Sequence, residues 1–491
     1  MSRWRGFAVD LGASNGRTVL GEYDGTKLTL SEVSRFSNVP VNLGGILYWN
    51  FLGLYHEVVA GLSKSSSQSK PPVTLGIDSW AVDFGLLDAN GDLMQNPRHY
   101  RDHHNDGMMQ EVFARIPVEN VYDRTGIQLI QINTIYQLMF LRLHRVQMLE
   151  QARHLLLFPD LINYFLTGVK VSEFTNVTTT QLFNPSLGTW DQDLISKLNF
   201  PQRIFTPVVS PFQVIGTIRE EVISGGKTEK ISVVTVGEHD TASAVFAVPH
   251  ESDDYAYISS GTWSLVGTMS KKPVITESAR KYNFTNEGGV AGDYRVLKNV
   301  MGLWLLQEVK RKFDQAGQAF SYSDLTGLAA KAKPLQCVID PDAPDFLAPE
   351  NMVEVIQTYC LRTGQTRPSD PGEISRAIFE SLALKYRFVI EKLEEVTGRS
   401  LEVVHIVGGG VHNELLCQMT ADATHKPVVA GPAEATVIGN ICAQLIAVQE
   451  LTATEVPVLV RNSFETKVYT PRKDRSAWDQ AYLKLTSLLG D

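Results

Sequence analysis

Asp240 stands where a buried strand ends and an apolar helix begins, in the run Gly237-Glu238-His239-Asp240-Thr241. A carboxylate in this place could accept a proton from a substrate hydroxyl that attacks a phosphoryl group. Aspartate is also a common helix N-cap, whose side chain accepts bonds from backbone N–H groups. The two roles can coexist, and the first gains weight only if the chain also binds phosphate.

Two turns between β-prone runs have the composition of phosphate-binding loops. The first lies within FAVDLGASNGRTVLGEY at residues 7–23, and the second within YAYISSGTWSLVGTM at residues 255–269. Small and hydroxyl-bearing residues let phosphate oxygens approach backbone N–H groups. Each turn alone is equally consistent with an ordinary hairpin, but the two together favour a nucleotide. Asp10, at the end of the first strand, could hold a magnesium-bound water.

A third glycine-rich site, Gly408-Gly409-Gly410, lies between a predicted strand at 401–407 and a helix. A turn that leads into a helix N-terminus attracts phosphate, and its flat backbone would also let an adenine or ribose lie close. The alternative is a tight strand-to-helix turn. The absence of G-x-G-x-x-G spacing disfavours a Rossmann site. Gly226-Lys227-Thr228 resembles the end of a P-loop, but it precedes a strand and is predicted to be a surface turn.

A sugar-type ligand needs several polar groups that converge. The candidates are Asp78, Trp80, Asp83, Arg101, Asp102 and Asn299. Each could equally be a structural polar group or a core aromatic residue.

The elements that must position these residues follow an α/β pattern. Strands are predicted at 7–11, 18–23, 28–36, 73–77, 81–88 and 231–236, with helices at 52–62 and through 133–166. In the second half, a helix runs from an Asp370 N-cap and Pro371 to Gly398. Strand and helix patterns then alternate, which predicts a parallel sheet with helices on its faces. The polar, proline-bearing stretch 248–254 is a plausible domain boundary.

Composition narrows the class of protein. The 491 residues predict two or three domains, and the net charge of −9 without a Lys/Arg run disfavours nucleic acid. The four cysteines form no C-x-x-C pair, which fits a reducing cytosol. No apolar stretch reaches the ~20 residues of a membrane helix, and the first strand leaves no room for a signal peptide. We therefore expect a cytoplasmic protein with no membrane partner.

Together these motifs resemble the FGGY carbohydrate kinase family, within the actin/hexokinase/heat-shock ATPase superfamily. The resemblance runs through nearly the whole chain, in VDLGASNGR, GIDSWAVDFGLLD, HYRD, NTIYQL, NVTTTQL, HDTASAV, SSGTWSL, TNEGG, RVLKNVMGLWLLQ, HIVGGG and AGPAEATVIGN. It implies an α/β fold of two ribonuclease-H-like (actin-type) domains, 1–250 and 255–491. Each would be a mixed β-sheet flanked by helices, with a catalytic cleft between them.

The resemblance also implies residue roles. Asp240 would be the catalytic base, and the sugar would be contacted by Ala81, His239, Asp240, Thr241 and Asn299. ATP would be bound by Ala13, Ser14, Asn15, Gly16, Arg17, Thr262, Gln307 and Gly409, with Mg²⁺ near Asp10. The family pattern has Gly at the position of Ala81, so the added methyl bears on substrate preference.

The implied reaction is ATP-dependent phosphorylation of the 1-hydroxyl of L-rhamnulose, giving L-rhamnulose 1-phosphate and ADP in L-rhamnose catabolism. One alternative is a kinase for another ketose, such as L-fuculose or L-xylulose. More distant ones are a non-metabolic ATPase of the superfamily and a sugar-binding regulator without catalysis. Asp240 and the lack of a separate partner-binding domain argue against the ATPase, and the presence of both Asp240 and all the phosphate loops argues against the regulator. The protein is expected to be a monomer or a homodimer.

Overall fold

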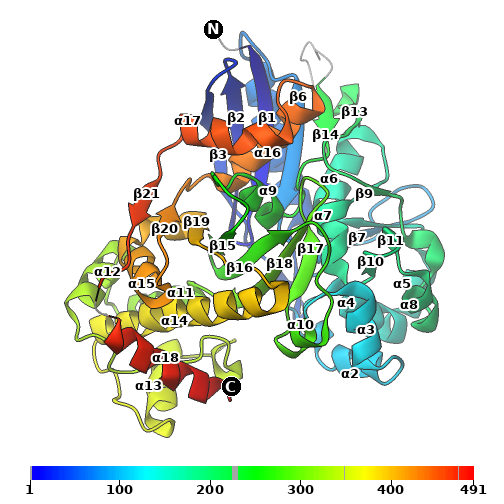
Figure 1. Cartoon of the computed structure of the whole chain (residues 1–491). Coiled ribbons are helices and arrows are strands. Elements are labelled where there is room, and N and C mark those ends of the chain that lie inside the picture. The colour runs from blue at the N-terminus through cyan, green and yellow to red at the C-terminus, as the bar shows by residue number, and fades with distance from the viewer. Residues whose placement is uncertain (1–2, 224–230, 348, 474, 491) are drawn as a thin grey trace. The chain divides into compact units, whose positions relative to one another are not determined.

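The protein forms two compact units in the computed structural model of Figure 1, which describes residues 3–223, 231–347, 349–473 and 475–490. Unit 1 contains the described residues within Met1–Pro249, Met269–Val296 and Ala435–Ser463. Unit 2 contains those within His250–Thr268, Leu297–Glu434 and Phe464–Asp491. The predicted surface turn at Gly226-Lys227-Thr228 lies outside the described residues.

Unit 1 is built on a mixed six-stranded sheet of order β13-β14-β6-β1-β2-β3. The strands are β1 (Trp4–Leu11), β2 (Asn15–Tyr23), β3 (Leu28–Ser37), β6 (Thr74–Ser79), β13 (Val214–Thr217) and β14 (Ser232–Val234). β1, β2 and β3 form an antiparallel meander, whereas β1, β6 and β14 run parallel. The carboxyl ends of these three parallel strands therefore meet at one edge, where ligands commonly bind to such sheets.

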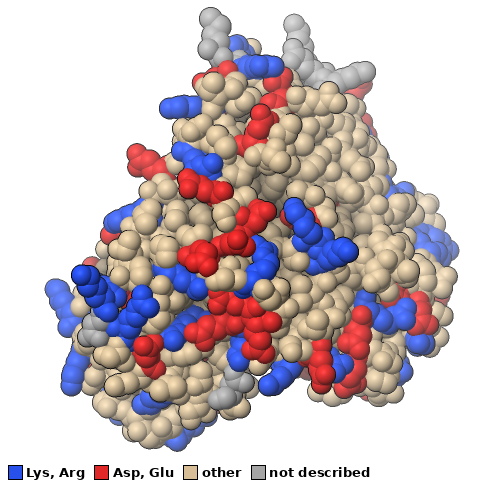
Figure 2. All heavy atoms as spheres, viewed as in Figure 1, with Lys and Arg blue, Asp and Glu red and all other residues tan. Residues whose placement is uncertain are grey.

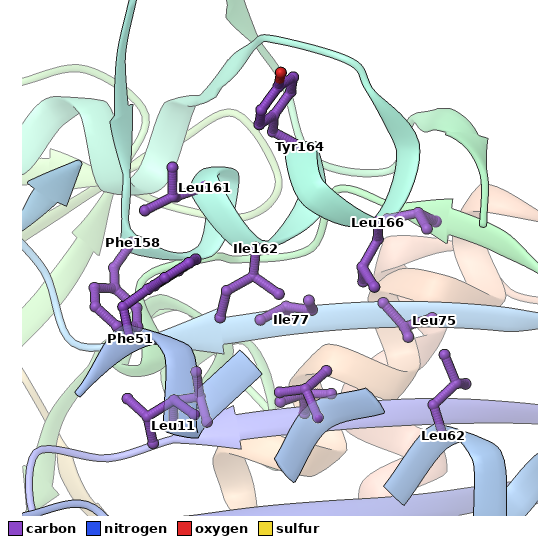
Figure 3. Packing of buried hydrophobic residues seen from close by; sticks show 14 of the residues in the cluster. Leu11, Phe51, Leu62, Leu75, Ile77, Phe158, Leu161, Ile162, Tyr164 and Leu166 are labelled. Atoms are coloured by element: carbon purple, nitrogen blue, oxygen red, sulfur yellow. The ribbon is translucent and has the colours of Figure 1, made fainter. Parts of the chain in front are cut away.

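Period-two alternation decides what covers each face of this sheet. Leu11, Leu75 and Ile77 point into a fully buried apolar core. Figure 3 shows them meeting side chains of α1 (Phe51–Ser66) and α6 (Phe158–Thr167), such as Phe51 and Ile162. The apolar runs of β1 and β6 thus bury one face beneath two amphipathic helices.

On the opposite face of β1 and β6 the residues are small, and they leave room for a helix that comes much later in the chain. Side chains of α16 (Ala435–Ala447) lie where a Cβ at Gly76 would be. Gln444 accepts a bond from Thr74 at 2.7 Å, which ties this helix to β6. α16 also contacts α9 (Asp240–Phe246), and Gly439 lies so close to the carbonyl of Ser243 that a Cβ would overlap it.

The rest of unit 1 includes a second apolar core, which is formed by residues between 84 and 208. Further elements of unit 1 are β4 (Val41–Leu43), β5 (Ile46–Tyr48), β7 (Phe84–Leu87), α2 (Met108–Phe113), α3 (Val118–Thr125), α4 (Thr134–His144), α5 (Val146–Gln151), β8 (His154–Leu157), β9 (Ser172–Glu173), α7 (Phe174–Val177), β10 (Phe183–Asn184), β11 (Thr189–Trp190), α8 (Gln192–Lys197), β12 (Val208–Val209), α10 (Glu277–Lys281), β17 (Thr285–Gly288) and α17 (Val456–Ser463). The predicted helical stretch 133–166 was partly wrong, because β8 interrupts it to pair with β7. The predicted strand 81–88 was too long, because Val82 has φ +69° and β7 begins only at Phe84.

Unit 2 carries most of a seven-stranded sheet of order β17-β18-β16-β15-β19-β20-β21. Its further strands are β15 (Tyr255–Ser260), β16 (Trp263–Ser270), β18 (Tyr294–Met301), β19 (Val403–Val407), β20 (Val428–Ala430) and β21 (Lys467–Tyr469). Its helices are α11 (Trp304–Gln315), α12 (Tyr322–Lys331), α13 (Met352–Arg362), α14 (Pro371–Thr397), α15 (Glu414–Thr424) and α18 (Ser476–Leu489). β15, β19 and β20 run parallel, as the strand–helix alternation predicted. The Asp370 N-cap and the Gly398 stop of α14 are confirmed.

The charged side chains are mixed in sign over the face shown in Figure 2, in line with a net charge of −9. All four cysteines are free and buried. Among the helices of the described residues, none is both long enough and apolar enough to span a bilayer.

Candidate active site

Three aspartates gather at the carboxyl ends of the parallel strands of unit 1. Asp10 in β1 is in register with Asp78 in β6, and Asp240 begins α9 shortly after β14. Asp10 Oδ2 accepts from Arg17 Nε at 2.8 Å and lies 2.7 Å from Arg17 Nη2. Asp78 is fully buried and accepts from Asn440 Nδ2 at 2.6 Å. Asp78, which was a candidate for contact with a sugar, is therefore hydrogen-bonded within the protein itself.

Asp240 differs from Asp78 in being open to a ligand, since its side chain is 28 % exposed. Burial raises the pKa of Asp240, and the negative charge of Asp10 raises it further, against the opposing effect of His239. Burial likewise holds the pKa of Asp78 well above its ordinary value, with Asp10 adding to the effect. A carboxylate whose pKa is moved upward, toward neutral pH, is better suited to accept a proton.

Asp240 is not the N-cap residue of α9. His239 occupies the N-cap position without a side-chain cap bond, and Asp240 is the first helical residue. Asp240 Oδ1 accepts from the backbone N–H of its neighbour Thr241 at 2.5 Å. The other carboxylate oxygen has no such bond within the helix start.

His239 is held by a buried ion pair from β17 and β18. Its Nδ1 lies 3.0 Å from Arg295 Nη2 and 3.3 Å from Glu287 Oε2, and its Nε2 lies 3.5 Å from Asp240 Oδ1. Arg295 and Glu287 are 3.1 Å apart. Burial pushes the pKa of Glu287 upward, but Arg295 and His239 more than offset it, so that the pKa lies below its ordinary value.

The first predicted phosphate turn is a tight, partly open connection between β1 and β2. Gly12 N donates to Asn15 O at 2.8 Å, and Asn38 Nδ2 donates to Gly12 O at 2.9 Å. Ala13 is half-buried, whereas Ser14 and Asn15 are exposed. The turn is thus fixed from beneath while its outer residues remain accessible to an anion.

The second predicted turn joins β15 to β16 in unit 2 and lies against the start of α11. Gly261 O and Thr262 O accept from Leu303 N and Trp304 N, each at 3.1 Å. The side chains of Thr262 and Gln307 lie 3.5 Å apart. Two residues predicted to contact ATP therefore stand side by side at the start of this helix.

The three glycines after β19 have separate structural reasons. Gly408 has φ +83°, and a Cβ at Gly410 would overlap the side chain of Ser260 on β15. Gly409 has neither constraint: it is exposed, and a Cβ there would meet no atom within 4 Å. Only Gly409 is thus unexplained by the protein's own packing, which fits the close approach of a ligand.

The segment after β6 is strained and rigidly held. Val82 has φ +69°, a genuine outlier for a β-branched residue, and its carbonyl accepts from Thr134 Oγ1 at 2.6 Å. Asp83 accepts from Trp49 Nε1 at 2.5 Å and from Trp80 Nε1 at 3.0 Å. Burial raises the pKa of Asp83 to about 7 despite these bonds. Asp83 and Trp80 are thus engaged with each other, while the half-buried Ala81 lies between Trp80 and the strained Val82.

Three further carboxyl groups are buried behind the Asp240 turn. Asp160, Glu173 and Glu238 are each at most 2 % exposed. Burial and their mutual repulsion raise the pKa of Asp160 and of Glu238 well above the ordinary values. Burial raises the pKa of Glu173 to about 7. The segment that leads to Asp240 therefore packs against three buried carboxyl groups. Their surroundings favour the protonated form of these three groups.

Sequence reasoning missed Glu287, Arg295, Trp49 and this carboxyl cluster. Glu287 and Arg295 lie within TNEGG and RVLKNVMGLWLLQ, but no spacing rule connects them with His239, which precedes Arg295 by 56 residues. Asn299, a predicted sugar residue, is half-buried in the same strand as Arg295. Arg101 and Asp102 lie near His99 and His104, where Asp102 accepts from His104 N at 3.0 Å.

The donors near Asp240 fit a magnesium ion that arrives with a nucleotide. Within the described ranges, no three or more His, Cys, Asp or Glu side chains are grouped so that they could hold a metal ion. Asp10 and Asp240 are hard oxygen donors of like charge, close enough for Asp10 to raise the pKa of Asp240. Mg²⁺ is commonly bound through one or two carboxylates plus substrate phosphates.

Two family models together match most of the chain. The N-terminal domain of the FGGY family of carbohydrate kinases matches residues 6–247, and the C-terminal domain matches residues 256–448. The chain belongs to the FGGY family of carbohydrate kinases. It is therefore an enzyme that phosphorylates a sugar, with ATP as co-substrate.

Curated relatives of this FGGY kinase cover nearly the whole chain. The rhamnulokinase of Oceanobacillus iheyensis is 42 % identical over 463 residues, 94 % of this chain and 97 % of that one. The rhamnulokinase of Bacteroides thetaiotaomicron is 42 % identical over 478 residues, 97 % of this chain and 98 % of that one. The rhamnulokinase of Bacillus subtilis is 40 % identical over 477 residues, 97 % of both chains.

Solved structures of kinases with low sequence identity to this chain share its fold. A ligand-bound xylulose kinase from Lactobacillus acidophilus has a TM-score of 0.81 at 17 % identity, covering 99 % of this chain and 98 % of that one. The glycerol kinase of Plasmodium falciparum with ADP has a TM-score of 0.79 at 14 % identity, covering 99 % and 97 %. The predicted fold, two actin-type α/β domains with mixed sheets flanked by helices, is confirmed.

Proposed function

We propose that this FGGY kinase transfers the γ-phosphoryl group of ATP to the 1-hydroxyl of L-rhamnulose, in L-rhamnose catabolism. The choice of sugar is supported by curated relatives named rhamnulokinase, three of them 40–42 % identical over nearly the full length. The choice of reaction is carried by Asp240, whose partly exposed carboxylate stands at the ligand edge of the sheet with a raised pKa.

Asp240 is proposed as the general base. As the 1-hydroxyl oxygen bonds to the γ-phosphorus, its proton passes to the Asp240 carboxylate. The bond between the γ-phosphorus and the β–γ bridging oxygen breaks, so the products are L-rhamnulose 1-phosphate and ADP. Ala81, His239, Thr241 and Asn299 are proposed to contact the sugar.

The nucleotide is proposed to be bound by the three glycine-rich turns. Ala13, Ser14, Asn15, Gly16 and Arg17 would contact the phosphates, together with Thr262, Gln307 and Gly409. The exposed outer residues of the first turn and the open position at Gly409 support this assignment. Mg²⁺, held near Asp10, would supply charge neutralisation at the β- and γ-phosphates.

The division into domains 1–250 and 255–491 remains our proposal, supported by family models that match 6–247 and 256–448. A cytoplasmic location and a monomeric or homodimeric state are also proposed. Nucleic acid and membranes are not expected as partners.

A panel of ketoses in an ADP-release assay tests the proposed substrate. The purified protein with Mg-ATP should release ADP faster with L-rhamnulose than with L-fuculose or L-xylulose. Faster turnover with another ketose would overturn the assignment while leaving a sugar kinase. ADP release that no sugar accelerates would instead point to an ATPase that does not act on a sugar.

A further inference from the structure

His239 meets a guanidinium group on one ring nitrogen and the catalytic carboxylate on the other. Arg295 Nη2 lies 3.0 Å from His239 Nδ1, within hydrogen-bond distance. A guanidinium group has N–H donors and no acceptor, so this bond requires a lone pair on Nδ1. In a neutral imidazole the proton is then on Nε2, which lies 3.5 Å from Asp240 Oδ1.

Glu287 offers the opposite arrangement, because its Oε2 lies 3.3 Å from the same Nδ1 and could accept a proton from it. In that arrangement the N–H of Nδ1 and an N–H of Arg295 would point at each other, and neither could accept a hydrogen bond. Arg295 is fully buried, and its Nη1 already has no hydrogen-bond partner among the described residues. Nη2 would then keep only its ion pair with Glu287 Oε2, 3.1 Å away, so the buried guanidinium group would lose a hydrogen bond.

The surroundings of Arg295 hold it in this position. Its Nε donates to Gly288 O at 2.9 Å, and its Nη2 lies 3.1 Å from Glu287 Oε2. Glu287 is 5 % exposed, so its negative charge neutralises the positive charge of Arg295 in a site with little solvent. The ion pair therefore directs an N–H toward Nδ1 without leaving a net buried charge.

We propose that Arg295, neutralised by Glu287, is a positioning residue that keeps His239 in the Nε2–H tautomer, so that the imidazole donates toward Asp240. This inference rests on the proposed role of Asp240 as general base. The donated proton orients Oδ1 and leaves Oδ2 for the sugar hydroxyl. The same interaction favours the ionised form of the base.

Nitrogen NMR of histidine-labelled protein tests the tautomer without any turnover. The His239 signals are assigned by their loss in a His239→Gln variant, and long-range proton–nitrogen correlations distinguish the two tautomers. We expect the proton on Nε2 in the wild type. A proton on Nδ1 would overturn the proposal, whether or not the protein phosphorylates L-rhamnulose.

A double-mutant cycle tests the coupling to catalysis. Arg295→Gln should lower kcat about tenfold with ATP affinity unchanged, and Arg295→Lys should restore part of the loss. In the His239→Gln background, whose amide can donate without a tautomer, Arg295→Gln should change kcat less than about twofold. Equal factors in both backgrounds would overturn the proposal.

Two further variants separate folding from positioning. Arg295→Gln with Glu287→Gln removes both buried charges together, which avoids leaving one unpaired. Arg124→Gln removes a different ion pair of unit 1, with Asp191 at 2.7 Å, and should change stability but not kcat. If the wild type turns over a ketose other than L-rhamnulose, the cycle is run with that ketose. A wrong substrate assignment can then be distinguished from a wrong role for Arg295.

Discussion

Of Asp78, Asp83 and Asp240, only Asp240 has a partly exposed carboxylate. Asp78 and Asp83 are at most 1 % exposed and bonded to Asn440, Trp49 and Trp80, whereas the Asp240 side chain is 28 % exposed. Replacement of Asp240 by Asn should lower kcat by about 10²–10⁴-fold, because the amide cannot take up the proton. ATP affinity should stay the same.

ADP release and calorimetric titration with ATP measure these two quantities for Asp240→Asn, with the exposed Asp123→Asn as the control. The wild type should also lose activity as the pH falls through the raised pKa of Asp240, since the base must be ionised. Turnover of the Asn variant within tenfold of the wild type would reduce Asp240 to a structural residue.

Neighbouring glycines after β19 should respond differently to the same added methyl group. A Cβ at Gly410 would overlap Ser260, so Gly410→Ala should lower the melting temperature. Gly409→Ala meets no protein atom within 4 Å and should leave the melting temperature unchanged while weakening ATP binding. Thermal unfolding with and without ATP separates the two effects. Unchanged ATP affinity in Gly409→Ala would contradict a nucleotide contact there.

Among the elements, the connection from β14 to α9 packs against carboxyl groups whose pKa is raised by burial. The pKa of Glu173 is raised to about 7 from 4.5, and that of Glu238 is raised in the same direction. A raised pKa in the folded state means that this stabilisation is complete at pH values below about 4.5 and is lost as the pH rises through about 7. The melting temperature of the wild type should therefore fall as the pH rises from 5 to 8.

Glu238→Gln should reduce this pH dependence, because an amide keeps the bond from Asn163 Nδ2, 2.8 Å from Glu238 Oε1, and cannot ionise. We expect a melting temperature near that of the wild type at pH 5 and a few degrees higher at pH 8. Scanning calorimetry across this range makes the comparison, with Glu111→Gln, whose side chain is 46 % exposed, as control. A variant whose pH profile parallels the wild type would show that Glu238 does not ionise in this range.

Sequence patterns predicted local elements well and long-range neighbours poorly. The strand–turn–strand units at β1–β2 and β15–β16 and both ends of α14 are confirmed, because alternation, turn residues and caps are local signals. Periodicity also predicted α16 but not its place on β1 and β6. His239, Glu287 and Arg295 came together only through strand pairing and tertiary packing, which no spacing in the sequence records.

For the molecule as a whole, the metal should matter for turnover and not for folding. Mg²⁺ is commonly bound through one or two carboxylates plus substrate phosphates, so we expect it to enter with the nucleotide beside Asp10. EDTA should abolish ADP release and excess Mg²⁺ should restore it, while the melting temperature of the ligand-free protein stays unchanged. A drop in that melting temperature with EDTA would indicate a metal bound by the protein itself.

The late position of α16 in the chain constrains how the enzyme is made. α9 ends at Phe246, but the helix that covers it begins at Ala435. At about 5–20 residues per second, a ribosome needs roughly 10–40 seconds to synthesise the intervening chain. During that interval the small-residue face of β1 and β6, and the Asp78 carboxyl group, lack their cover. The N-terminal half therefore cannot complete its own packing until nearly the entire polypeptide has been translated.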